Sequence, residues 1–165
     1  MSTASRFIGR PHDFDFLRGA WQLTNRRLRE RLTGCAEWDE FPATVRGQTL
    51  LDGAVSVDET TFPTRGFTGM TLRSLDRQTN QWSIWWINSA DGRLQPPVHG
   101  GFDGDRGEFY GDDIDAGRAV KVRFIWTRGA TAARWEQAFA LPGDDAEATW
   151  ETNWVMEMRR VGASP

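Results

Sequence analysis

The stretch AVKVRFIWT at residues 119–127, followed after a short polar turn by ARWEQAF at residues 133–139, decides the fold. In the first segment, alternation separates Val120, Val122, Phe124 and Trp126 from Lys121, Arg123 and Thr127. In the second, Trp135 and Phe139 fall opposite Arg134 and Glu136. A period of two residues with one apolar and one wet face is typical of antiparallel strands. The two segments therefore predict a β-hairpin.

Turn signals recur on both sides of this hairpin, about every dozen residues, as expected of short strands joined by hairpins. Asp52-Gly53, Asp91-Gly92 and Asp103-Gly104 are examples, and Asp-Gly is a favoured hairpin pair because glycine accepts positive φ. About ten consecutive strands must protect their edges, and closure into a barrel does so. We expect an all-β fold: one antiparallel up-and-down β-barrel spanning residues 1–165, with a flexible N-terminus over residues 1–11.

Three segments are less clear. Residues 12–18 favour a short helical turn, and residues 25–32 place Leu28 and Leu32 four apart, which fits a helix as well as a strand. Residues 81–88 are densely aromatic on both faces, so either Trp86 or, after a slip of one residue, Trp85 points inward.

Composition limits the classes of function. The formal net charge is −3, which argues against a nucleic-acid partner, and no long uncharged apolar run predicts a membrane span. The single Cys35 excludes an intrachain disulfide, and no secretory signal is visible. We therefore expect a cytoplasmic protein, monomeric or homodimeric. Cys35, His12 and His99 lie too far apart in sequence to predict a metal site.

Two short motifs carry a resemblance to known proteins. Gly19-Ala20-Trp21 near the first strand and Arg159-Arg160 on the last resemble the lipocalin/calycin pattern, which implies that Trp21 closes one barrel end beneath an arginine. The wider chain resembles a bacterial lipocalin-like family of unknown function. The matching stretches are residues 12–17, 82–86, 96–98, 109–113, 122–126, 135–139 and 150–156. This resemblance implies a barrel fold and no particular reaction.

The chain has nine Trp and ten Phe but one Tyr, so aromatic rings are available to line a cavity. Polar residues share a face with several of them: Asn88 with Trp86, Gln137 with Trp135, and Thr152 with Trp154. An aromatic cavity with a few converging polar groups is typical of a small-molecule site. The predicted ligand-binding residues are Trp85, Trp86, Asn88, Phe124, Trp126, Trp135, Gln137, Thr152, Trp154 and Met156. The leading hypothesis is binding of a small hydrophobic or aromatic molecule, with no cofactor.

Two other functions stay open, because fold does not determine function. One is an enzyme on the same barrel, an isomerase, cyclase or hydrolase acting on a hydrophobic metabolite. Glu136 and Glu151 each follow a tryptophan, and burial beside an indole would raise a carboxyl pKa, although alternation puts Glu136 on the outer face. The other is a haem-binding barrel with His12 or His99 as the axial ligand.

The hairpin around residues 103–106 suggests a candidate catalytic pair. If Gly104 and Asp105 form the two-residue loop, His99 lies directly opposite Tyr110. Directly opposed side chains in a sheet approach closely, and an imidazole with a phenol forms a conceivable acid–base couple. A catalytic role requires both side chains to reach the cavity mouth. The alternative is an external pair on a solvated hairpin.

Overall fold

The computed structural model describes residues 5–143 and 149–162, and these residues form ten β-strands and two short 3₁₀ helices. The helices are η1 (Asp15–Leu17) and η2 (Leu51–Gly53). The strands are β1 (Gly19–Leu28), β2 (Trp38–Leu50), β3 (Val55–Phe62), β4 (Phe67–Asp76), β5 (Gln81–Asn88), β6 (Val98–Asp103), β7 (Arg106–Asp115), β8 (Arg118–Thr127), β9 (Ala132–Ala140) and β10 (Glu151–Arg160).

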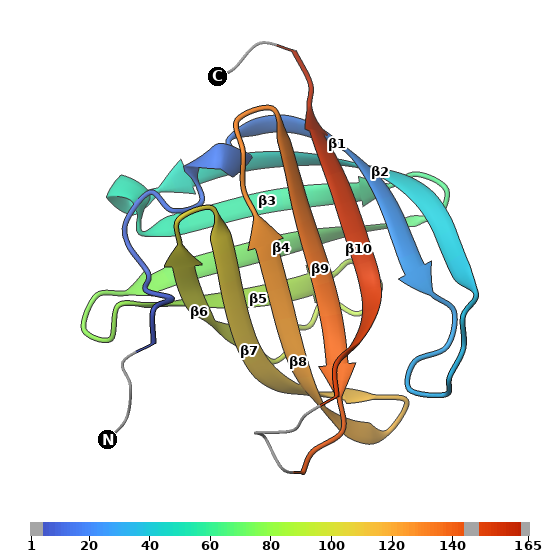
Figure 1. Cartoon of the computed structure of the whole chain (residues 1–165). Helices are drawn as coiled ribbons and strands as arrows, with labels where there is room; N and C mark the ends of the chain where they lie inside the picture. Colours follow the sequence, from blue (N-terminus) through green and yellow to red (C-terminus); the bar gives the residue numbers. More distant parts are fainter. Residues whose placement is uncertain (1–4, 144–148, 163–165) are drawn as a thin grey trace.

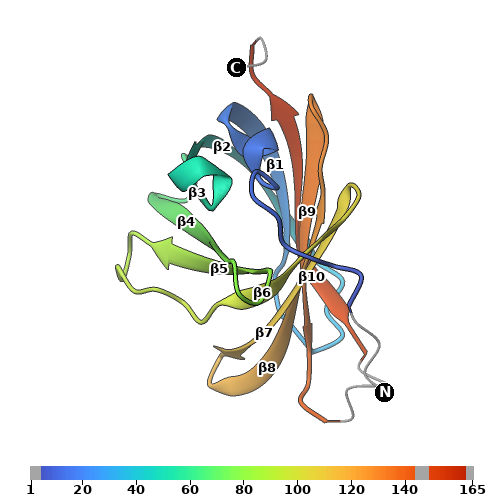
Figure 2. The ribbon, with the colours of Figure 1, turned by 90° about the vertical axis from the view of Figure 1, so that its left-hand side faces the viewer.

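Each strand pairs antiparallel with its sequence neighbours, and β1 pairs with β10, so the sheet closes into a barrel (Figure 1). The predicted up-and-down barrel is confirmed. Residues 25–28, which fitted either a helix or a strand, belong to β1. Figures 1 and 2 show β3, β4 and β5 forming the wall across the barrel from β8, β9 and β10.

One end of the barrel is covered by the segment that leads into β1. Phe14 and Leu17, in and beside η1, are fully buried in the core. Trp21 is also fully buried, and the Arg160 guanidinium lies 4.5 Å from the centroid of its ring. The arrangement predicted for this tryptophan and the arginines of the last strand is confirmed, with Arg160 in the covering position.

The segment before η1 is held against the barrel. Ile8 exchanges two backbone hydrogen bonds with Phe102, and the amide of Gly9 donates to the carbonyl of Asn80 at 2.8 Å. The buried Asp13 carboxylate accepts from the Trp82 indole N–H at 2.9 Å and from the Arg10 amide at 2.7 Å. These contacts attach residues 8–13 to the barrel, and residues 1–4 lie outside the described residues.

Strand β10 contains an irregularity that reverses the alternation read from its sequence. Thr152 pairs with Ala138 and Trp154 with Gln137, so two steps along β10 match one step along β9. Such a β-bulge shifts the side chains on one side of it to the opposite face. Trp150 consequently contacts Tyr110 and Arg123 on the outside of the barrel, while Trp154 faces inward.

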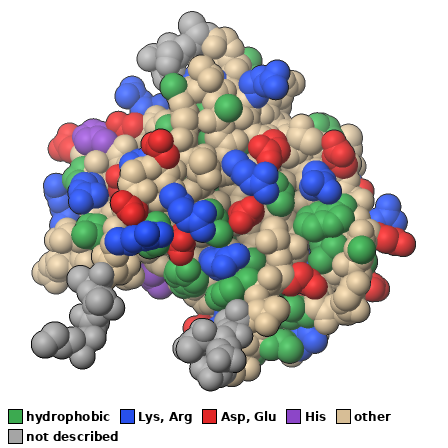
Figure 3. All heavy atoms as spheres, viewed as in Figure 1, with side chains coloured by type: hydrophobic (Ala, Val, Ile, Leu, Met, Phe, Trp, Pro, Cys, Tyr) green, Lys and Arg blue, Asp and Glu red, His purple; other side chains and the backbone are tan. Residues whose placement is uncertain are grey.

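The outer face of β8, β9 and β10 carries both signs of charge. Acidic and basic side chains are interspersed on this face (Figure 3), and Arg134 pairs with Glu136 and Glu157 at 3.1 and 2.6 Å. Within residues 5–143 and 149–162, no helix has the length and apolar character needed to cross a membrane.

Candidate functional site

The barrel encloses a cavity of about 140 Å³. Its lining is mostly apolar: Leu17, Leu23, Val45, Ile84, Trp86, Pro96, Val98, Val122, Phe124, Trp126, Trp135, Trp154, Met156 and Met158. Seven polar residues complete the lining: Asp58, Thr60, Thr71, Arg73, Gln95, Asp113 and Gln137. Pro96 is exposed and Gln95 and Asp113 are half-buried, whereas Asp58 and Arg73 are buried, so the cavity leads inward from the loop before β6.

One side of the cavity is aromatic. Trp135 makes edge-to-face contacts with Phe124 and Trp154, with ring centroids 4.9 and 5.8 Å apart. Such pairs stabilise beyond their buried area and hold the rings in defined orientations. Trp86 joins from β5, and its indole lies directly against Gly69 on β4, where a Cβ atom would overlap the ring. Glycine at position 69 therefore makes the space that Trp86 occupies.

The opposite side of the cavity is polar. In the closed strand order, β3 lies five strands from β8 in both directions. The inner face of β3 is therefore opposite the aromatic side of the cavity. Asp58 on β3 and Arg73 on β4 form an ion pair at 2.7 Å, and Arg73 Nη1 donates to Ser56 Oγ at 3.1 Å. Thr60 Oγ1 lies 3.5 Å from Asp58 Oδ1. We call Ser56, Asp58, Thr60, Thr71 and Arg73 the polar strip.

Gln137 contributes a second polar group from the aromatic side. Its Nε2 donates to Asn153 Oδ1 at 2.9 Å, and Asn153, which belongs to the bulge in β10, is fully buried. The same wall holds a third amide: Asn25 Oδ1 accepts from the Trp154 indole N–H at 3.0 Å. These hydrogen bonds orient the polar groups that lie among the rings.

The cavity brings together most of the ligand-binding residues predicted from sequence. Those that line it are Trp86, Phe124, Trp126, Trp135, Gln137, Trp154 and Met156. Three others do not line it. Trp85 alternates with Trp86 and points away, Asn88 Oδ1 accepts from the Ala90 amide in the turn after β5, and Thr152 lies on the outer side of the bulge. The inward expectation for Thr152 fails because the bulge makes Asn153 the buried residue.

The predicted pairing of His99 with Tyr110 is confirmed, but the pair lies outside the barrel. His99 Nδ1 is 2.8 Å from Ser83 Oγ, and the Tyr110 hydroxyl donates to Glu108 Oε1 at 2.6 Å. His99 is exposed, Tyr110 is 45% exposed with the rest of its side chain covered, and neither lines the cavity. The condition set for a catalytic role, access to the cavity mouth, is not met.

The Tyr110 contact has a clear electrostatic consequence. Burial and the hydrogen bond to Glu108 raise the pKa of Tyr110 to about 12. Burial acts to raise the pKa of Glu108 as well, but hydrogen bonds from Tyr110 and Arg106 outweigh it and hold that pKa below its ordinary value. A phenol with a raised pKa is a poor acid near neutral pH, which fits a structural role for this pair.

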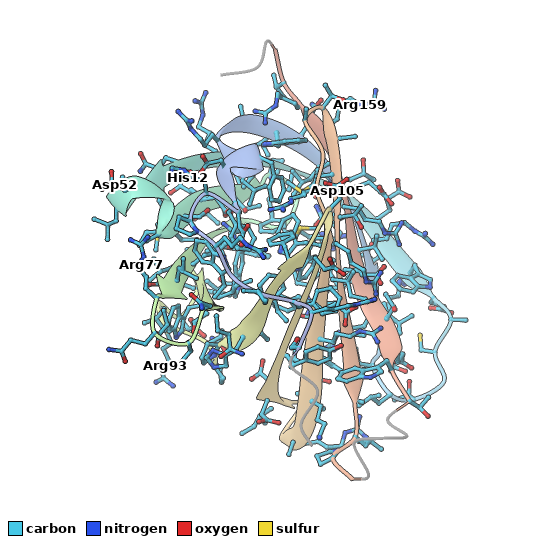
Figure 4. All side chains as sticks on the ribbon, turned by 60° about the vertical axis from the view of Figure 1, so that its left-hand side comes forward. His12, Asp52, Arg77, Arg93, Asp105 and Arg159 are labelled. Atoms are coloured by element: carbon cyan, nitrogen blue, oxygen red, sulfur yellow. The ribbon has the colours of Figure 1, made fainter. Side chains whose placement is uncertain are left out.

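The other predicted chemistry is also placed away from the cavity. His12, at the covered end beside η2 (Figure 4), bonds through Nδ1 to Asp15 Oδ2 at 2.8 Å. No histidine lines the cavity, so the haem hypothesis has no axial ligand among the cavity-lining residues. Glu136 pairs with Arg134 outside, and Glu151 accepts from the Leu32 amide. Among the residues that the structure describes, no cluster of three potential metal ligands occurs.

Sequence reasoning missed the polar strip. The signal was present, because Ser56, Asp58 and Thr60 alternate in register with the apolar Phe62, and Arg73 with Leu75. Charged residues in a strand are ordinarily assigned to the solvent face. In both strands, however, alternation with the apolar residues places these polar side chains on the inward face.

Neither family models nor curated proteins contain a match to this chain.

Proposed function

We propose that the protein binds a small hydrophobic or aromatic molecule inside the barrel. The observation that carries this proposal is the cavity itself, apolar and aromatic on one side and polar on the other. Its volume of about 140 Å³ is close to that of an engineered apolar cavity that binds benzene, about 150 Å³. The size supports a molecule with one aromatic ring.

We also propose that the protein is lipocalin-like and that it is located in the cytoplasm. The stacking of Arg160 on Trp21 supports the first, and the single Cys35 supports the second.

The test is binding of toluene, followed by the rise in melting temperature with ligand concentration. A ligand that binds only the folded protein stabilises it in proportion to the logarithm of its concentration above Kd. Native mass spectrometry of the freshly purified protein would show whether a small molecule co-purifies. Wild-type protein should bind toluene with one site per chain.

A cavity-filling variant locates the site. Val122→Phe adds volume to the buried lining and should abolish toluene binding, whereas Val161→Phe, the same change at an exposed position, should leave it unchanged. Equal binding by both variants would place the ligand elsewhere and contradict the proposal.

A further inference from the structure

Asp58 and Arg73 form an ion pair that is buried inside the barrel. Arg73 is 3% exposed and Asp58 is 5% exposed, and both line the cavity. Taking two charges out of water has a large desolvation cost, and well-packed apolar residues at such positions are often equally or more stabilising. The hydrophobic core around the pair consists mainly of Trp, Phe, Leu and Val side chains. The pair is therefore better explained by recognition than by stability.

The guanidinium of Arg73 has unused hydrogen-bonding capacity. It carries five N–H groups. Nη2 is paired with Asp58 and Nη1 with Ser56, while Nε is buried with no partner. The group also lies over the rings of Phe14 and Trp126, at 5.0 and 5.7 Å from their centroids. Because rings occupy its face, further hydrogen bonds form at its edge, where the N–H groups lie.

The charges of the lining residues determine which ligand group can bind at the N–H edge of Arg73. Asp58 neutralises Arg73, and the third charged lining residue, Asp113, is acidic. A carboxylate that enters the cavity therefore adds uncompensated negative charge to a buried site, and a cation placed at the N–H edge of Arg73 lies against a like charge. A neutral acceptor such as a carbonyl oxygen gains a charge-assisted hydrogen bond without adding net charge.

We propose that the ligand is an uncharged single-ring aromatic molecule with a hydrogen-bond acceptor attached to the ring, bound to the Arg73 guanidinium while Asp58 excludes aromatic carboxylates. This inference rests on the proposed function. The ring packs against the wall formed by Phe124, Trp135 and Trp154, and the acceptor reaches across to the polar strip.

Four single-ring probes test the inference: benzamide, benzoate and benzamidinium, which share one shape, and the smaller, apolar toluene. Binding to the wild-type chain is measured by calorimetry at neutral pH. Benzamide should bind at least about tenfold more tightly than the other three, because its carbonyl oxygen accepts a hydrogen bond from a charged group. Benzoate equal to or tighter than benzamide would overturn the inference.

Two variants assign the selectivity to the pair. Asp58→Asn leaves the guanidinium uncompensated and should reverse the preference, so that benzoate binds more tightly than benzamide. The double variant Arg73→Met with Asp58→Asn removes both charges, and it should bind toluene as tightly as benzamide. If the double variant keeps the tenfold preference for benzamide, Arg73 is not the recognition group.

The probes also separate the two proposals. If toluene binds and benzamide gains nothing over it in the wild-type chain, the cavity binds ligands and the inference fails. If none of the four binds, the proposed function fails and the inference with it. The wild-type comparison decides both questions even where a variant does not fold.

Discussion

The guanidinium of Arg160 lies 4.5 Å from the centroid of the buried Trp21 ring and closes one end of the barrel. The same group donates to three backbone carbonyls, those of Phe16 and Arg18 at 2.6 Å and of Ala130 at 2.8 Å. One side chain of β10 thus joins the segment before β1, the ring at the start of β1 and the turn between β8 and β9.

Arg160→Met should reduce the free energy of unfolding by about 2–4 kcal/mol, because charge-assisted hydrogen bonds and a cation–π contact are lost together. Urea denaturation measures the effect. Arg159→Met is the matched control: Arg159 is exposed on the neighbouring position (Figure 4), and its change should stay within about 0.5 kcal/mol. Equal losses in both variants would show that Arg160 does not hold this end closed.

Gly69→Ala should destabilise the barrel by about 1–3 kcal/mol and weaken toluene binding, because the new methyl group overlaps the indole of Trp86. Thermal unfolding and the toluene titration measure the two effects. Gly143→Ala is the control, since a Cβ there meets no atom within 4 Å. Unchanged affinity in Gly69→Ala would mean that the position of Trp86 does not matter for the ligand.

The single tyrosine should titrate well above its ordinary range. Burial and the Glu108 hydrogen bond raise the pKa of Tyr110 from 10.0 to about 12, so phenolate absorbance should appear only as the pH approaches 12. The raised pKa favours the neutral phenol in the folded state. Its contribution to stability is therefore complete below pH 10 and is lost as the pH rises from 10 to about 12.

Glu108→Gln should shift this phenol titration to lower pH, because the charge and the strong acceptor are removed while the burial of Tyr110 persists. Tyr110→Phe, which should abolish the phenolate signal, identifies its source. A titration midpoint that does not move in Glu108→Gln would contradict the hydrogen bond as a cause.

Asn153→Ala should reduce the free energy of unfolding by about 1–3 kcal/mol, because the Gln137 amide loses its buried acceptor. Thr152→Ala, one residue earlier on the outer side of the bulge, should cost less than about 1 kcal/mol. Chemical denaturation of both variants measures the difference. A larger loss for Thr152→Ala would indicate that the alternation runs through β10 without a shift.

Local chemistry in the sequence determined the architecture. Alternation in residues 119–127 and 133–139, with turn signals between segments, predicted the antiparallel barrel and the inward faces of β8 and β9. The Gly104-Asp105 turn predicted the register that pairs His99 with Tyr110. These features depend on the period of a strand and on turn conformations, which neighbouring residues set by themselves.

Only the tertiary structure decided which polar residues find a partner inside the barrel. Asp58 is buried because Arg73, on the next strand, compensates its charge, and Asn153 turns inward at a bulge where Gln137 bonds it. Arg160 covers Trp21 because β1 and β10, at opposite ends of the chain, meet where the barrel closes. A buried polar group is tolerated only when a partner satisfies it, and that partner is brought close by the fold.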